Sequence, residues 1–145
     1  MGRRPSWKDR RDRYFAVDFL YRRPSADVLE PLFIAVDAGE IRLVASTVSL
    51  LEVLVHPLRH GDDVLASRYS DVLLSTPYIS TIPVTPTTVQ VAAELRATSN
   101  LKTPDAIHLA TAINHDADVF LTNDRDFGQI DSLEVIKVRD LASST

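Results

Sequence analysis

The chain has 145 residues, of which 45% are hydrophobic and 25% charged, and these proportions fit one globular domain that buries a core of its own. The absence of cysteine excludes disulfides, zinc–thiolate sites and thiol redox chemistry, and no stretch reaches the roughly 20 apolar residues of a membrane span, so we expect a cytoplasmic protein without membrane contact. The formal net charge is -4, but the charges are distributed unevenly along the chain. Residues 1–23 carry eight Lys/Arg against three Asp, whereas residues 24–145 carry eight Lys/Arg against seventeen acids. The acidic excess of residues 24–145 argues against broad nucleic-acid binding by this part of the chain and favours a cation-binding site.

The first two predicted elements follow this basic segment. Residues 13–17 are short, aromatic and branched, a composition typical of a β-strand. Residues 26–37 place apolar side chains at helical spacing, with Ser25 as the N-cap and Gly39 just beyond the end. The pattern predicts one strand followed by one helix.

A second strand and helix come next. Residues 41–45 read as a buried strand. Ser46 and Thr47 then supply capping hydroxyls for a helix that we expect to run through Val55, because a residue before proline avoids the helical conformation and Pro57 follows.

The remaining elements continue the alternation of strands and helices. Thr85 with Pro86, and Thr103 with Pro104, each match an N-cap followed by a proline in the first helical turn. The predicted elements are a helix over 62–74, a strand over 79–84, a helix over 86–98, a helix over 104–116, a strand over 118–121 and a strand over 134–138. This order predicts an α/β fold, a layered α/β/α sandwich around a mostly parallel sheet.

Three segments divide the chain. Residues 1–23 form a basic and atypical N-terminal segment, to be read as a disordered leader, a nucleic-acid arm, a contact for a partner protein or a degenerate first strand. Residues 24–140 form the domain, and residues 141–145 form a tail.

Four acids stand out by their position. Glu52 is the one ionisable residue in an otherwise apolar helical run, and Asp105 stands at the start of a helix. Asp124 and Asp126 directly follow the strand over 118–121. Each acid alone has an ordinary structural explanation: a solvent-facing helix position, a favourable helix dipole, or a turn.

Together these acids predict a site, because they belong to elements that meet at the carboxyl edge of a parallel sheet. Gathered carboxylates repel one another unless a hard cation such as Mg²⁺ binds among them, and such sites hydrolyse phosphodiesters. The four histidines have no convincing ligand spacing, so no role is assigned to any of them; they are His56, His60, His108 and His115.

Three segments carry a family resemblance: Ser46-Thr47-Val48-Ser49-Leu50-Leu51-Glu52-Val53-Leu54, Lys102-Thr103-Pro104-Asp105-Ala106-Ile107-His108-Leu109-Ala110-Thr111-Ala112 and Leu121-Thr122-Asn123-Asp124-Arg125-Asp126-Phe127. In order and separation they resemble PIN-domain nucleases, and VapC-type toxin ribonucleases of toxin–antitoxin systems in particular. The resemblance covers roughly residues 26–138 and implies a Rossmann-like nuclease domain that depends on Mg²⁺ or Mn²⁺. It also implies an RNA substrate, dimerisation and inhibition by a cognate antitoxin.

The same resemblance assigns roles residue by residue. Glu52 and Asp105 match acidic positions of the metal site, Asp124 matches the acid after the fourth strand, and Asp126 matches its less constant neighbour. Thr122 looks like the hydroxyl residue beside them.

The front of the chain departs from the family pattern, which opens with a strand that ends in Asp and small polar residues. Asp18 follows the strand over 13–17 and is the best candidate by position, whereas Asp12 gives the better spacing to the next helix. This departure leaves open a catalytically impaired PIN-like module that binds an antitoxin or RNA without cutting.

A phosphoacceptor receiver domain is a further alternative of similar length with an acidic Mg²⁺ pocket. It would need an adjacent Asp pair early in the chain, which is missing, and a Lys that closes the pocket, whereas Lys137 lies within the last strand.

Overall fold

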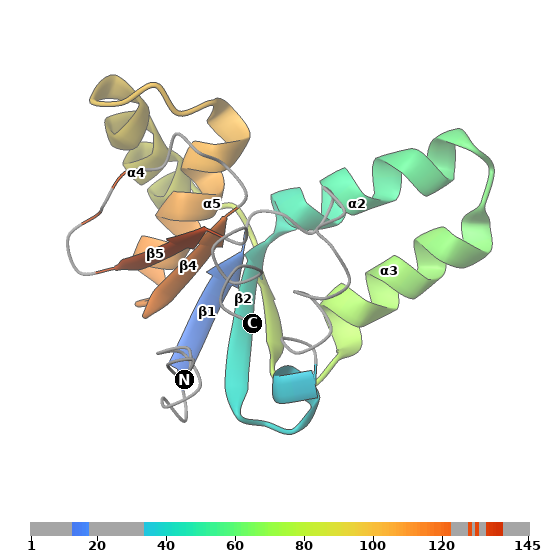
Figure 1. The fold of residues 1–145 in the computed structure, drawn as a ribbon. Helices are drawn as coiled ribbons and strands as arrows, with labels where there is room; N and C mark the ends of the chain where they lie inside the picture. The colour runs from blue at the N-terminus through green and yellow to red at the C-terminus, as the bar shows by residue number, and fades with distance from the viewer. Residues whose placement is uncertain (1–12, 18–33, 123–127, 129, 131–132, 138–145) are drawn as a thin grey trace.

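The computed structural model describes residues 13–17, 34–122, 128, 130 and 133–137. In these residues one five-stranded sheet forms the centre of the molecule, with the strand order β3-β2-β1-β4-β5 (Figure 1). The strands are β1 (Arg13–Val17), β2 (Ile41–Ser46), β3 (Ile79–Ile82), β4 (Val119–Thr122) and β5 (Glu134–Lys137). Every neighbouring pair runs parallel, which confirms the predicted parallel α/β sheet.

The strand order distinguishes the predicted PIN-like fold from the receiver-domain alternative. It places β2 and β3 on one side of β1 and β4 and β5 on the other, so the direction of winding reverses between β1 and β4. This is the 3-2-1-4-5 arrangement of nucleotide-binding folds, whereas receiver domains have the order 2-1-3-4-5. The topology therefore contradicts the receiver-domain alternative, and it predicts a site at the carboxyl ends of β1 and β4.

The central strand is the one that the N-terminal sequence predicted. Phe15, Ala16 and Val17 are all buried, because a strand in the middle of a parallel sheet is covered on both faces. In register, Phe15 pairs with Leu43 of β2 and with Val119 of β4. The predicted strand over 13–17 is confirmed.

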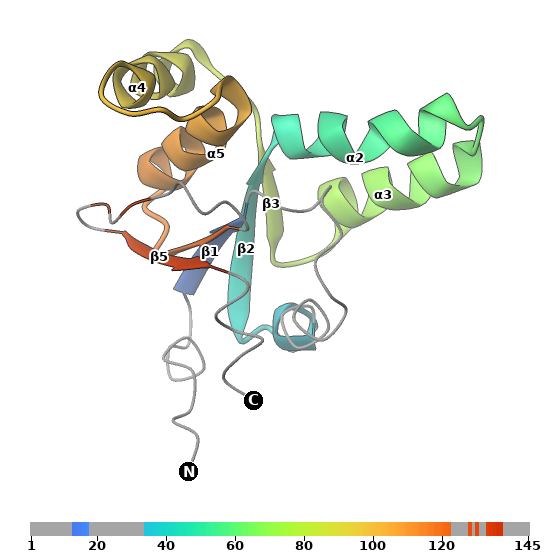
Figure 2. The ribbon, with the colours of Figure 1, turned by 45° about the horizontal axis from the view of Figure 1, so that its top comes forward.

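Four helices surround the sheet in the described part of the chain: α2 (Thr47–Arg59), α3 (Asp63–Ser75), α4 (Pro86–Ala97) and α5 (Thr103–Asn114). Figures 1 and 2 show α4 and α5 together beside the sheet, and α2 and α3 as a pair that projects from the β2–β3 side. Residues 34–37 are also helical; the rest of the predicted helix over 26–37 lies outside the described residues. Among the described helices, none has the length and apolar character needed to cross a membrane.

The two faces of the sheet bury separate hydrophobic clusters. One cluster packs the strands against residues 34–37 and consists of Phe15, Val17, Ala35, Val36, Ile41, Leu43, Val119 and Leu121. The other packs them against α4 and α5 and includes Ala16, Val44, Ala92, Ala106, Leu109, Ala110 and Phe120. Since successive side chains of a strand point to opposite faces, this alternation gives the predicted α/β/α sandwich.

Most predicted helix boundaries differ from the observed ones by a few residues, and two of these differences have a structural reason. The predicted end of α2 at Val55 was wrong, because the helix continues to Arg59. Pro57 lies within the last turn and is buried. A proline in the last turn removes one hydrogen bond only, and burial of its ring offsets that loss. At α5 the N-cap is Lys102 instead of Thr103, whose hydroxyl accepts a hydrogen bond from Nη1 of Arg96 at 2.9 Å.

Candidate active site

The start of α2 lies at the carboxyl edge of the sheet. β2 ends at Ser46, and this residue is also the N-cap of α2. Its Oγ accepts a hydrogen bond from the backbone N–H of Val48 at 3.1 Å, which satisfies one of the free donors of the first helical turn. Ser46 therefore fixes where the helix that carries Glu52 leaves the sheet.

The start of α5 lies at the same edge. The helix ends at Asn114, and the chain enters β4 only five residues later at Val119, so the C-terminal end of α5 lies near the amino edge of the sheet. A helix of 12 residues is about 18 Å long, which brings its first turn back to the carboxyl edge. That turn contains Asp105, whose side chain is buried with 7% of the residue exposed.

His108 connects the two helices. Its Nε2 lies 3.0 Å from Oε1 of Glu52, and its Nδ1 lies 3.2 Å from Oγ of Ser46. An ionised carboxylate only accepts hydrogen bonds, so Nε2 carries the proton and donates to Glu52. In the tautomer with hydrogen on Nε2 alone, Nδ1 accepts from the Ser46 hydroxyl, whose oxygen accepts from Val48 N–H. This assignment, made from the hydrogen-bond network, uses every polar atom of the buried ring.

Asp105 and His108 share one face of α5. They are three residues apart, and side chains at this spacing are neighbours on a helix surface. Both are buried, and Asp105 stands in the first turn, where the positive end of the helix dipole favours a carboxylate. One turn of α5 thus carries a buried acid and the histidine that binds Glu52.

The structure describes only part of the predicted site. It brings Glu52 and Asp105 onto the two helices that His108 joins, and it places Thr122 at the end of β4, fully buried. Asp18, Asp124 and Asp126 lie outside the described residues. Within the residues that are described, no group of three acids or histidines stands close enough to hold a metal ion.

The donor chemistry of the described acids fits a hard divalent cation. Glu52 and Asp105 offer carboxylate oxygens, which Mg²⁺ and Mn²⁺ prefer. Oε1 of Glu52 is occupied by His108, whereas Oε2 accepts no hydrogen bond from the part of the chain that is described.

The sequence pattern indicated no role for His108, yet this residue forms a buried polar link between α2 and α5. Its signal was an imidazole at the same helical face as Asp105, flanked by Ile107 and Leu109. The other histidines lie elsewhere. His60 and His115 are exposed at helix ends, and the Nδ1 of His60 lies 2.9 Å from the backbone oxygen of its neighbour His56.

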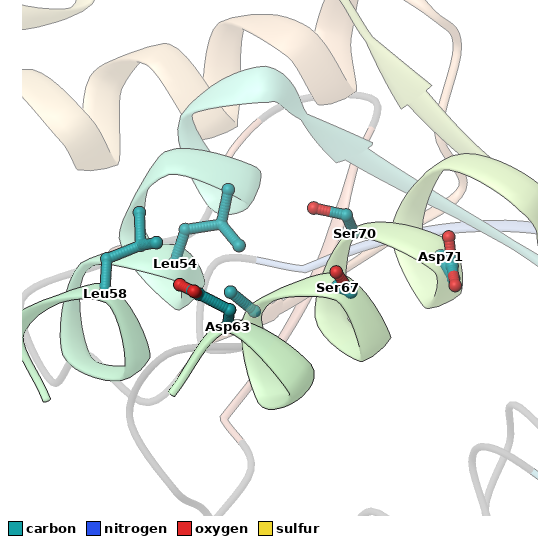
Figure 3. A pocket seen from close by; sticks show the side chains of 7 residues that line it. Leu54, Leu58, Asp63, Ser67, Ser70 and Asp71 are labelled. Carbon is teal, nitrogen blue, oxygen red and sulfur yellow. The ribbon is translucent and has the colours of Figure 1, made fainter. Parts of the chain in front are cut away.

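Figure 3 shows a hollow between α2 and α3, with the side chains that line it. It has a volume of about 320 Å³, and no predicted site residue lines it. Its lining residues are Leu54, Leu58, Asp63, Ala66, Ser67, Ser70 and Asp71. We assign it no part in the acidic site.

The fold is similar to that of several solved structures. A toxin–antitoxin complex from Klebsiella pneumoniae is 24% identical, with a TM-score of 0.55 over 83% of this chain and 94% of that one. VapBC2 from Rickettsia felis, bound to a DNA fragment from its promoter, is 16% identical, with a TM-score of 0.62 over 86% and 98%. VapBC-5 from Mycobacterium tuberculosis is 19% identical, with a TM-score of 0.54 over 88% and 99%. At these identities the similarity shows a shared fold.

No curated protein matches the sequence closely enough to count as a relative. A family model described as the PIN domain matches residues 12–133, a range that contains β1 and both described acids of the site. This match spans most of the chain and confirms the resemblance seen in the three sequence segments. The protein therefore belongs to the PIN domain family.

Proposed function

We propose that this PIN domain is a Mg²⁺-dependent endoribonuclease of the cytoplasm, with Mn²⁺ as an alternative ion, that hydrolyses RNA phosphodiester bonds. PIN domains are generally nucleases. The observation that carries the proposal is the placement of Glu52 and Asp105 at the carboxyl edge of the sheet, next to the point where its winding reverses.

The site would be completed by acids from the strand ends. Glu52, Asp105 and Asp124 would hold the ion, with Asp126 as an auxiliary acid. A bound Mg²⁺ supplies charge for the phosphoryl oxygens and a water of lowered pKa. The protein residues supply the negative charge that binds the ion and a fixed geometry in which the RNA phosphate meets it.

Asp18 is the proposed fourth acid. It is the residue directly after Val17, with which β1 ends, whereas Asp12 precedes the strand. In a parallel sheet the carboxyl end of the strand faces the site, and this favours Asp18.

The division of the chain after residues 23 and 140 stays a prediction.

A catalytically impaired module that binds RNA or an antitoxin is the second candidate. It is favoured by Phe19 and Leu20, which stand after Asp18 where the family pattern has small polar residues. Metal-dependent cleavage of RNA by the purified chain would eliminate this candidate.

We further propose that the protein is the toxin of a toxin–antitoxin pair and binds a cognate antitoxin, with homodimer formation as a second association. Three of the similar folds belong to toxin–antitoxin proteins. α2 and α3 also expose apolar side chains that a partner would cover, namely Leu51, Val55, Leu58, Val64 and Val72. Co-expression with the protein encoded by the adjacent reading frame should abolish RNA cleavage, and light scattering of the purified chain should report a dimer.

The decisive test is cleavage of a mixed RNA substrate with Mg²⁺, with Mn²⁺ and with EDTA. We expect cleavage that EDTA stops. Asp105→Asn should lower the rate by at least about 100-fold, since each 1.4 kcal/mol of lost transition-state stabilisation is tenfold in rate. Asp63→Asn is the matched control, because Asp63 is also a first-turn acid but is exposed at the start of α3. Cleavage that is insensitive to both EDTA and Asp105→Asn would reject the proposal.

A further inference from the structure

We propose that His108 is a positioning residue of the acidic site: its hydrogen bond to Oε1 holds the Glu52 carboxylate in the orientation in which this acid would bind a divalent ion. This inference rests on the proposed metal-dependent function. It assigns a role to a residue that would act through its hydrogen bond to Glu52.

The geometry of the ring supports this role. The His108 side chain is 1% exposed and that of Glu52 is 14% exposed, so the contact lies at the boundary between core and surface. A ring hydrogen-bonded at both nitrogens cannot rotate without breaking two bonds. A free glutamate side chain samples many rotamers, and each one that is lost costs entropy when a ligand binds. His108 removes that freedom before the ion arrives.

The position of His108 also links the two acids. α2 projects away from the sheet with α3, whereas α5 packs on the sheet through Ala106, Leu109 and Ala110. His108 ties Glu52 to the turn of α5 that carries Asp105. The spacing of the Glu52 and Asp105 carboxylates is therefore set by this contact as well as by the backbone.

Packing alone does not account for an imidazole at this place. An apolar side chain would fill the same volume without the cost of burying two polar nitrogens. Instead, Ser46 of β2, His108 of α5 and Glu52 of α2 form a continuous series of hydrogen bonds, in which the hydroxyl hydrogen and the ring hydrogen each have an acceptor. Carboxylate ligands of metals are commonly oriented by such hydrogen bonds, and loss of the partner typically costs about 10- to 100-fold in metal affinity.

The test is Mn²⁺ binding by the full chain, measured by calorimetry and by the electron paramagnetic resonance signal of Mn²⁺. His108→Leu, which keeps bulk but no donor, should weaken binding by about 10- to 100-fold. His108→Gln keeps an N–H near the position of Nε2 and should restore affinity to within about threefold. His115→Leu is the matched control, because this exposed histidine follows the end of the same helix and should leave the affinity unchanged.

The outcomes separate the two proposals. If the unmodified chain binds no Mn²⁺ and cuts no RNA, the proposed function falls and the positioning role falls with it. If the unmodified chain binds Mn²⁺ and a folded His108→Leu binds it equally well, only the positioning role is rejected. Equal loss of affinity in His108→Gln and His108→Leu, with both folded, also rejects it.

A measurement on the unmodified chain covers the case in which His108→Leu does not fold. The ¹⁵N shifts of the metal-free protein should show a hydrogen on Nε2 of His108, with the ring in one orientation. Absence of a hydrogen from Nε2, or averaging between two tautomers, would overturn the proposal, because Nε2 would then not hold Glu52.

Discussion

Nε2 of His108 lies 3.0 Å from Oε1 of Glu52, a contact between two residues 56 positions apart in the sequence. It joins the first half of α2 to the first half of α5. Both helices begin at the carboxyl edge of the sheet, so this contact is part of the architecture of the site as well as of the fold.

Glu52→Ala and Glu52→Gln should separate the structural and the metal-binding contributions of this carboxylate. The alanine variant leaves the buried Nε2–H of His108 without an acceptor, which should lower the free energy of unfolding by about 1–3 kcal/mol. The glutamine variant keeps an acceptor oxygen and should retain most of that stability. Urea denaturation measures this difference, and Mn²⁺ titration should show weakened binding in both variants. Equal stability of the two variants would contradict the hydrogen bond.

Ser46→Ala and Ser49→Ala are a matched pair, since both hydroxyls are buried with 1% of each residue exposed. The Ser46 hydroxyl caps α2 and bonds to His108, and its loss should cost about 2 kcal/mol of unfolding free energy. Ser49 Oγ has no hydrogen-bond partner in the described structure, so its removal should change the stability by less than about 0.5 kcal/mol. A larger loss for Ser49→Ala in thermal and urea unfolding would show that this hydroxyl has a partner after all.

Leu109→Ala tests the packing of α5 on the sheet. Leu109 is 1% exposed in the cluster beneath α5, and the cavity left by truncation should lower the free energy of unfolding by about 2–5 kcal/mol. Leu51→Ala is the control with the same chemical change, because Leu51 is 62% exposed on α2 and its truncation should cost less than about 0.5 kcal/mol. Comparable losses in chemical denaturation would mean that α5 is not packed as described.

Local chemistry made most of the fold predictable. Thr85 accepts a hydrogen bond from the backbone N–H of Thr88 and caps α4 ahead of Pro86, as the residue order indicated. Ser46 caps α2 in the same way. The aromatic and branched residues of 13–17 indicated a strand, and the structure places that strand at the centre of the sheet.

Predictions from local sequence were wrong where a distant contact decided the outcome. Pro57 did not end α2: it lies within the last turn of this helix, and its ring is buried. Thr103 did not cap α5, because its hydroxyl bonds to Arg96 of α4. In both cases tertiary packing outweighed a preference worth a few kcal/mol at most.

The sequence by itself determined the order of elements, the parallel α/β class and the candidacy of Glu52 and Asp105, because capping, periodicity and residue chemistry act over a few neighbouring positions. Only the tertiary structure decided that His108 links these acids. Residues 52 and 108 meet because β2 and α5 bring Ser46 and one turn of a distant helix to the same sheet edge. A hydrogen bond depends on distances of about 3 Å that no local pattern encodes.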